Sequence, residues 1–157
     1  MKKQEERADD IRGLKLLFIL YILLVIKLLI FKYPMDELRA IMDTWESGVI
    51  WEGLDNANFT LFKTIKMYIN YAYKLNSFEN LVGNVAVFIP FGYILPKLHS
   101  SAEHWLTLIL WALFFSLGIE MFQLFSAFGA FDVDDLLLNV TGALIGYFVH
   151  LLIVKAF

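Results

Sequence analysis

The chain has 157 residues, of which 59% are hydrophobic and 17% aromatic, and its formal net charge is only −3. A water-soluble domain is nearer half apolar, and a nucleic-acid-binding domain normally carries a strongly basic surface. The composition therefore predicts a single membrane-embedded domain over residues 1–157 and excludes a nucleic-acid partner. Because the chain contains no cysteine, disulfides and thiolate metal sites are excluded as well.

Four long apolar runs predict an all-α integral membrane protein with four transmembrane helices, at about residues 14–33, 81–98, 105–125 and 136–154. Each run is close to the roughly 20 residues that a helix needs to cross a bilayer. The first run is too long for the core of a typical signal peptide, and no small-residue cleavage pattern follows it, so we expect it to be retained. The short links between the last three runs favour antiparallel neighbours in a bundle.

The segment 34–80 predicts an amphipathic loop. Apolar residues recur at helical spacing between charged ones at Leu38, Ile41, Met42 and Trp45. This pattern is typical of a helix that lies at a membrane interface. We expect the loop to lie on the membrane or to cap the bundle. Residues 58–60 (Asn-Phe-Thr) match a glycosylation sequon, a pattern that also arises often by chance.

The distribution of lysine and arginine predicts that both termini are cytoplasmic, because basic residues concentrate near the cytoplasmic ends of membrane helices. An even number of spans places both termini on one side. That side would hold Lys2, Lys3, Arg7, Arg12, Lys15, Lys97 and Lys155. The opposite side would hold Lys32, Arg39, Lys63, Lys66 and Lys74, spread through a much longer loop. The loop would then face the outside of a plasma membrane.

Polar residues inside or beside the last three runs predict a functional cluster in the outer third of the bundle. Glu120 interrupts the third run, and Gln123 follows on the same helix face. The antiparallel arrangement brings residues near the start of the second and fourth runs to a similar depth. Because polar groups inside a bilayer are costly, each is a candidate functional residue. The predicted cluster consists of Asn84, Glu120, Gln123, Asp132, Asp134, Asp135 and Asn139.

Structural roles for these residues stay open as alternatives. One of the three aspartates would cap the fourth helix, and the amides could hold helices together by hydrogen bonds. Lys27 lies at a depth similar to Glu120, so it could pair with that carboxylate or extend toward the interface. The aspartate spacing does not match a calcium loop, and the histidines lie toward the other membrane face. We therefore expect neither a metal nor a cofactor.

Proline and glycine residues indicate how the helices pack. Pro90 predicts a kink in the second helix because proline removes a backbone hydrogen bond, and Gly92 makes the same helix thin. Gly142 and Gly146 form a small-xxx-small ridge on the fourth helix. Such ridges let two membrane helices approach closely, so we assign these four residues to packing.

Three motifs resemble the VanZ-like family in order and spacing. Residues 84–92 (NVAVFIPFG) resemble its N-x-x-x-F-x-P-x-G helix, and residues 120–123 (EMFQ) resemble its E-x-x-Q motif. Residues 131–142 resemble its F-D-x-D-D-x-x-x-N-x-x-G motif, and Asn58 with residues 62–65 resembles a stretch often found upstream. Two positions depart from the pattern, because Gly129 and Ala130 stand where many members carry an arginine, and Leu61 stands where a proline is common.

The resemblance implies a bacterial plasma-membrane protein linked to low-level resistance to teicoplanin, a lipid-bearing glycopeptide that acts on cell-wall precursors outside the membrane. The favoured hypothesis is a non-enzymatic protein that binds an amphiphile at the outer leaflet, either a lipoglycopeptide or a lipid-linked cell-wall precursor. A second hypothesis is a small enzyme that acts on a lipid head group through Glu120 and Asp135 as general acid and base. A third is an ion or proton path, or an accessory subunit that partners another membrane protein.

Overall fold

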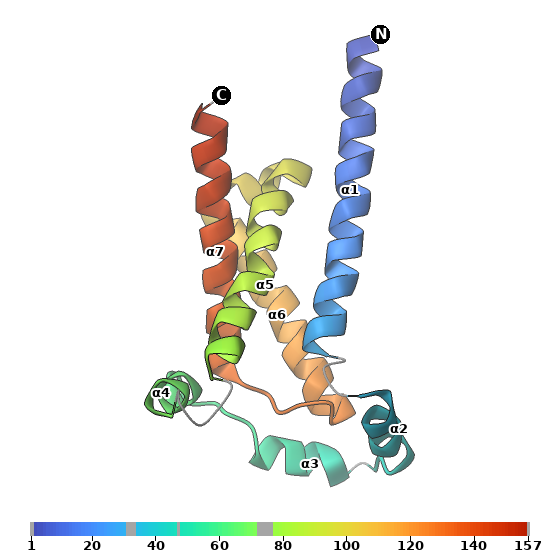
Figure 1. Ribbon diagram of the computed structural model, residues 1–157, viewed down its shortest axis with the longest axis vertical. Coiled ribbons are helices and arrows are strands. Elements are labelled where there is room, and N and C mark those ends of the chain that lie inside the picture. Colours follow the sequence, from blue (N-terminus) through green and yellow to red (C-terminus); the bar gives the residue numbers. More distant parts are fainter. Residues whose placement is uncertain (1, 31–33, 47, 72–76, 157) are drawn as a thin grey trace.

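The computed structural model describes residues 2–30, 34–46, 48–71 and 77–156, which form seven α-helices and one 3₁₀ turn, η1 (Ser100–Glu103). Four long helices run along the molecule, and three short helices lie across one end of it (Figure 1). The long helices are α1 (Lys2–Leu29), α5 (Ser77–Leu98), α6 (Trp105–Ser126) and α7 (Val133–Ala156). The short helices are α2 (Met35–Asp43), α3 (Gly48–Asp55) and α4 (Lys63–Asn70). The all-α prediction is confirmed, and both termini lie at the end opposite the short helices (Figure 1).

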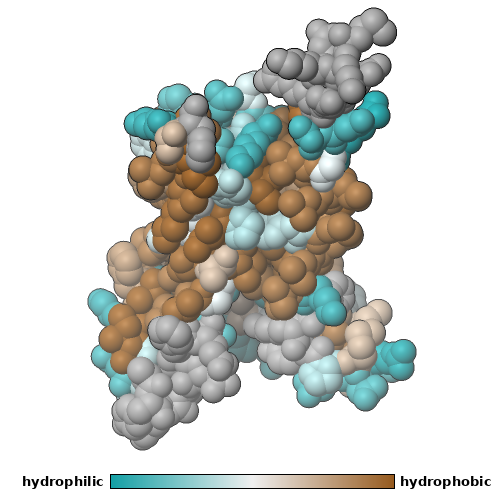
Figure 2. Space-filling view, turned by 45° about the horizontal axis from the view of Figure 1, so that its top comes forward, coloured by the Kyte–Doolittle hydropathy of each residue, from teal (hydrophilic) through white to brown (hydrophobic). Residues whose placement is uncertain are grey.

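Among the described residues, three helices are long and apolar enough to cross a membrane, namely Asn80–Leu98, Trp105–Ser126 and Val133–Ala156. They begin and end within a few residues of the predicted runs. An apolar belt lies between two hydrophilic ends of the molecule, as expected for a membrane protein (Figure 2).

The first predicted span, residues 14–33, differs from the prediction. Helix α1 begins at Lys2 rather than at residue 14, because the charged tail continues the helix. It ends at Leu29, so its last 18 residues contain three basic side chains, Arg12, Lys15 and Lys27, and α1 is not among the three candidate spans. The predicted last residues, 31–33, with Lys32 among them, lie outside the described part of the chain, as does Lys74.

Helices α5 and α7 make the closest contact of the bundle, and glycines make it possible. A Cβ atom added to Gly142 would overlap the carbonyl oxygen of Val85, and one added to Gly146 would overlap that of Ile89. From the other side, a Cβ atom on Gly92 would overlap the carbonyl oxygen of Ala143. Since each overlap is with backbone, which cannot move aside cheaply, a side chain at any of these positions would force the two helices apart.

Aromatic rings fill the centre of the bundle and attach α1 to α5. The ring of Phe91 lies 5.6 Å from Phe115 of α6 and 5.8 Å from Phe18 of α1. Tyr21 of α1 donates a hydrogen bond to the carbonyl oxygen of Val87 at 2.6 Å. Pro90 lies inside α5, close to this bond. The kink predicted at Pro90 stays a prediction.

The short helices cap one end of the bundle. Leu38 of α2 is buried in the apolar core, and Trp45 donates its indole N–H to the carbonyl oxygen of Phe125 at 3.0 Å. Gly53 of α3 lies against the side chain of Leu124. The predicted amphipathic helix therefore forms as α2, with Leu38 toward the bundle. Large apolar side chains such as Trp51, which is 72% exposed, remain on the outer surface of these helices.

Candidate functional site: a polar cavity and a loop anchor

A cavity of about 320 Å³ lies at the end of the bundle that the short helices cap. We call it the polar cavity. Its apolar wall comes from α1 and α5, and its polar side chains come from four helices. The polar lining residues are Tyr68, Asn80, Asn84, Glu120, Gln123, Asp135 and Asn139. Five of the seven residues in the predicted cluster thus line one cavity, and Asp132 and Asp134 do not.

Asn139 of α7 lies at the deep side of this cavity and is 1% exposed. Its amide nitrogen donates a hydrogen bond to the hydroxyl of Ser116 on α6 at 2.8 Å, and Ser116 is fully buried. The amide oxygen of Asn139 is buried without a hydrogen-bond partner. A buried acceptor left unpaired costs about 1–3 kcal/mol. An unpaired oxygen beside a polar cavity marks the place where a hydrogen-bond donor would fit.

Two carboxylates face the same cavity from different helices. Asp135 of α7 accepts a hydrogen bond from the Asn84 amide of α5 at 2.7 Å. Glu120 of α6 is 2% exposed, and its carboxylate accepts the backbone N–H of Asp132 at 2.9 Å. These bonds orient both carboxylates from the protein side. Helix α6 also supplies Gln123, whose amide donates to the carbonyl oxygen of Leu29 at 2.8 Å and so ties the end of α1 to the cavity.

Lys27 does not pair with Glu120. Val25 of α1 is 1% exposed and faces the bundle, and Lys27 lies two residues further along the helix. Two residues rotate a side chain by about 200° around a helix axis, so Lys27 points away from the bundle and is exposed. In the described part of the chain, the recorded ion pair is the exposed one between Arg12 and Asp9, at 3.4 Å. The position of Lys27 fits the alternative in which its side chain extends toward an interface.

Asp132 belongs to a second group of residues, which we call the loop anchor and which consists of Asn58, Thr64, Asp132 and Asp134. Asp132 caps α7, because its carboxylate accepts the backbone N–H of Asp134 at 2.8 Å. The same carboxylate accepts the amide N–H of Asn58 at 2.8 Å and the hydroxyl of Thr64 at 2.5 Å. The residue that caps α7 therefore also holds Asn58 and the first turn of α4.

Asp134 caps α4 from the other side of the anchor. Its side chain is fully buried, and its carboxylate accepts the backbone N–H groups of Phe62 at 2.6 Å, Thr64 at 2.8 Å and Ile65 at 3.2 Å. These are the N–H groups that a helix start leaves unpaired, and they favour a negative charge. Phe62 has a left-handed backbone with φ of 65° and offers no side-chain cap of its own. The start of α4 therefore depends on Asp134.

Asn58 joins the anchor through its backbone as well. It forms a parallel bridge with Asp132, in which Asn58 N–H donates to Phe131 at 2.8 Å and Val133 N–H donates to Asn58 at 3.0 Å. Its side chain is buried and its amide nitrogen is bonded to Asp132 and Thr64. Glycosylation at this sequon would require that amide to leave the anchor.

Tyr68 of α4 brings a phenol to the polar cavity from the short helices. Burial raises the pKa of Tyr68 above its ordinary value of 10.0, and the nearby carboxylates of Asp135 and Asp132 raise it further. The phenol is therefore neutral at physiological pH and can donate a hydrogen bond. Neither Tyr68 nor Ser116 belongs to the predicted cluster. Ser116 lies one turn before Glu120 on the same helix, a spacing that could have identified it, whereas nothing in the local sequence marks Tyr68.

Apolar helices of membrane-spanning length, with polar side chains converging on a cavity near one end, define a helical membrane protein with a candidate binding site. The sequence model of the VanZ/LLP1 family matches residues 18–154, and the chain belongs to this VanZ-like family. Protein VanZ of Enterococcus faecium is 33% identical over 70 residues, which make up 45% of this chain and 43% of that protein. The match thus spans less than half of the relative. No solved structure matches the chain. The family predicted from the three motifs is confirmed.

Proposed function

We propose that the protein is a bacterial envelope protein whose polar cavity binds the polar part of an amphiphile at the outer leaflet. The ligand class is a lipoglycopeptide such as teicoplanin or a lipid-linked cell-wall precursor. One observation carries the proposal, namely that the cavity is lined by hydrogen-bonding side chains from α4, α5, α6 and α7, among them Asn139 with its unpaired amide oxygen. Exposed apolar side chains on the short helices and the links between them, such as Trp51 of α3 and Phe59 between α3 and α4, support a location beside lipid tails.

The drug sensitivity of cells tests this function. A teicoplanin-sensitive Gram-positive host is compared with and without the gene, using teicoplanin and vancomycin. We expect the inhibitory concentration of teicoplanin to rise with the gene and that of vancomycin to change less, because teicoplanin carries the lipid chain. Asn139→Ala removes the amide from the cavity and should abolish the rise. Thr141→Val is the matched control, because the Thr141 hydroxyl is exposed and bonds to its own helix at Leu137.

Direct binding completes this test. The purified protein in lipid nanodiscs is titrated with teicoplanin and with a lipid-linked wall precursor, and the loss of one hydrogen bond in Asn139→Ala should weaken binding by about fivefold. Absence of binding to both ligands, together with unchanged drug sensitivity for the gene and for Glu120→Gln, contradicts the proposed function.

We also propose that α1 is a fourth span and that both termini are cytoplasmic. Residues 14–29 of α1 are apolar except for two lysines, and Leu16, Leu20 and Leu24 are more than half exposed, as lipid-facing residues are. Because the chain has no cysteine, single cysteines can be introduced at Ala156 and at Glu52 and labelled with a membrane-impermeant maleimide in intact cells. Labelling of Glu52→Cys alone is expected. Labelling of Ala156→Cys before permeabilisation would reverse the proposed orientation.

One observation favours a second candidate function, an enzyme that acts on a lipid head group. Glu120 and Asp135 are carboxylates on different helices that line one cavity, and differing environments can give such a pair the roles of acid and base. The only hydroxyl group among the described lining residues is that of Tyr68. Turnover of a lipid-linked precursor by the purified protein, with loss of turnover in Asp135→Asn, would favour this function over binding alone.

A further inference from the structure

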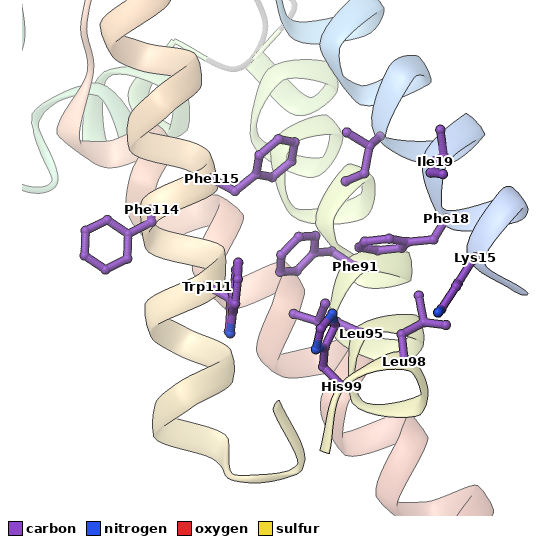
Figure 3. Close-up of a pocket in the computed structure, with 11 residues that line it drawn as sticks. Lys15, Phe18, Ile19, Phe91, Leu95, Leu98, His99, Trp111, Phe114 and Phe115 are labelled. Atoms are coloured by element: carbon purple, nitrogen blue, oxygen red, sulfur yellow. The ribbon is translucent and has the colours of Figure 1, made fainter. Parts of the chain in front are cut away.

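A second cavity lies toward the opposite end of the molecule, between α1, α5 and α6 (Figure 3). Its volume is about 550 Å³, which is larger than the polar cavity. We call it the apolar groove. Its walls are aliphatic and aromatic over most of their length, and polar side chains occur near the end of the bundle that carries the termini. The residues that matter most are Lys15, Phe18, Phe91, Leu95, His99 and Trp111.

The floor of the apolar groove is rigidly packed, and its rim is open. Phe91 and Leu95 of α5 are 3% and 4% exposed and form the floor. The ring of Phe91 stacks on Phe115 of α6 and faces Phe18 of α1 (Figure 3). Trp111 of α6 is 48% exposed at the rim. The groove therefore opens sideways, between α1 and α6, to the surroundings of the bundle.

If α1 spans the bilayer, this opening lies at hydrocarbon depth, where a lipid chain would fill it. An apolar void does not hold water, and an empty void loses the dispersion contacts of its walls. The groove runs along α1 from Lys15 to Ile22. Seven residues of helix correspond to about 10 Å, which accommodates a run of methylene groups.

The polar end of the groove carries a positive charge. Lys15 is exposed there and forms no ion pair in the described part of the chain. Figure 3 shows Lys15 beside Phe18 on α1, with His99 below Trp111 on the facing side. The rings of His99 and Trp111 stack at 6.2 Å. Lys97 is engaged elsewhere, because its ammonium group lies 3.8 Å from the centre of the Tyr93 ring.

We propose that the apolar groove binds an anionic phospholipid from the leaflet that holds the termini. An acyl chain packs along Phe91, Leu95 and Trp111, and the phosphate contacts the ammonium group of Lys15 and the ring N–H of His99. Basic residues in pockets between membrane helices recognise anionic head groups in this way. The proposal rests on α1 as a membrane span, and it is independent of any ligand in the polar cavity.

Quenching of tryptophan fluorescence by brominated lipid chains tests this site. The chain has four tryptophans, and replacing Trp45, Trp51 and Trp105 by Phe leaves Trp111 as the reporter in the groove. The nanodiscs keep the same ratio of phosphatidylglycerol to phosphatidylcholine throughout. In one series an increasing fraction of the phosphatidylglycerol is brominated, and in the other an increasing fraction of the phosphatidylcholine. We expect brominated phosphatidylglycerol to quench Trp111 at about fivefold lower mole fraction than brominated phosphatidylcholine, which corresponds to ~1 kcal/mol for one lysine.

Matched variants separate the groove from a general surface charge. Lys15→Gln should remove the preference, and Lys15→Arg should retain it. Lys155→Gln is the control, because Lys155 is an exposed lysine in the last turn of α7 and does not line the groove. Since Trp45→Phe removes the hydrogen bond to Phe125, the titration is repeated with Trp45 retained, and the preference should persist.

Three outcomes would overturn the proposal. They are equal quenching by the two brominated lipids, no quenching by either, and an equal loss of preference in Lys155→Gln and Lys15→Gln. Asn139→Ala distinguishes this site from the polar cavity, because it should leave the quenching of Trp111 unchanged whether or not it alters drug sensitivity.

Discussion

The loop anchor and the polar cavity contain neighbouring residues of one acidic motif and differ in how their polar groups are paired. Asp134 is fully buried and accepts three backbone N–H groups from the start of α4. Asp135, the next residue, faces the polar cavity and orients Asn84. One turn further along α7, Asn139 keeps an unpaired amide oxygen. The motif therefore combines a structural half with a half to which we assign the ligand in our proposal.

Because of this difference, we expect substitutions in one region to lower stability and substitutions in the other to weaken binding. Groups whose partners all come from the protein contribute to folding, and their loss leaves buried partners unpaired. A buried group left without a partner lowers stability, and in our proposal Asn139 is retained because it binds the ligand. Substitutions in the loop anchor should therefore destabilise the short helices, and substitution of Asn139 in the polar cavity should change binding alone.

The largest loss of stability is expected for Asp134→Ala. The change leaves three backbone N–H groups at the start of α4 without their acceptor, which should lower stability by roughly 3 kcal/mol or more. Thermal unfolding of the purified protein in detergent measures it. Asp135→Asn is the control, because an amide oxygen can still accept from Asn84 and the change should stay within about 1 kcal/mol. Similar losses of stability in both variants would contradict the division of the motif into a structural half and a binding half.

A smaller loss is expected for Thr64→Val, which has nearly the same shape. The Thr64 hydroxyl donates to Asp132 and accepts from Asn58, so the variant loses two hydrogen bonds while the backbone contacts to Asp134 remain. A decrease of about 1–2 kcal/mol should appear in the same unfolding assay. Thr44→Val provides the comparison, because that hydroxyl is exposed and bonds to its own helix. A drop as large as that of Asp134→Ala would show that the hydroxyl, and not the carboxylate, dominates the anchor.

Asn139→Leu should have almost no effect on stability. The substitution removes an unpaired buried oxygen, which is favourable, and it leaves the Ser116 hydroxyl without its donor, which is unfavourable. We expect a net change within about 0.5 kcal/mol, and a stabilised protein when Ser116→Ala is added. Ligand binding should nevertheless weaken, and the rise in the inhibitory concentration of teicoplanin should be lost. Marked destabilisation of the double variant would assign Asn139 to helix packing.

The smallest expected effect on stability comes from Tyr68 and appears only at high pH. The pKa of Tyr68 is raised above 10.0 in the folded protein, so the unfolded chain loses this proton first. Its contribution to stability is present below pH 10 and declines as pH rises through the folded pKa. Between pH 10 and 11, Tyr68→Phe should therefore lose less stability than the parent protein. An identical decline in both proteins would show that the phenol ionises as freely when folded.

Much of the fold could be predicted from the sequence, because apolar length alone identifies α5, α6 and α7. The start of α1 could not, since charged residues are as compatible with an exposed helix as with a tail. Periodicity identified α2, whereas the start of α4 is set by a contact with a distant segment, as the Asp134 cap shows.

The sequence could predict the candidate site only as a set of polar residues at a similar depth in the membrane. The antiparallel order of the helices predicted that Asn84, Glu120 and Asn139 lie close together, and all three line the polar cavity. The separation of Asp134 from Asp135 could not be predicted, because it depends on where the segment around Asn58 returns to the bundle. Lys27 failed as a partner for the same kind of reason, since the rotation of α1 is set by the burial of Val25 and not by depth.

The cap that Asp134 provides to α4 has a consequence for the order of assembly during synthesis. Phe62 and Asp134 are 72 residues apart, so the helix start leaves the ribosome long before the carboxylate that satisfies it. Chains are made from the N-terminus, and contacts between distant segments form late. The start of α4 must therefore remain hydrated until α7 enters the membrane. Insertion of the last helix is then the step that closes the polar end of the protein.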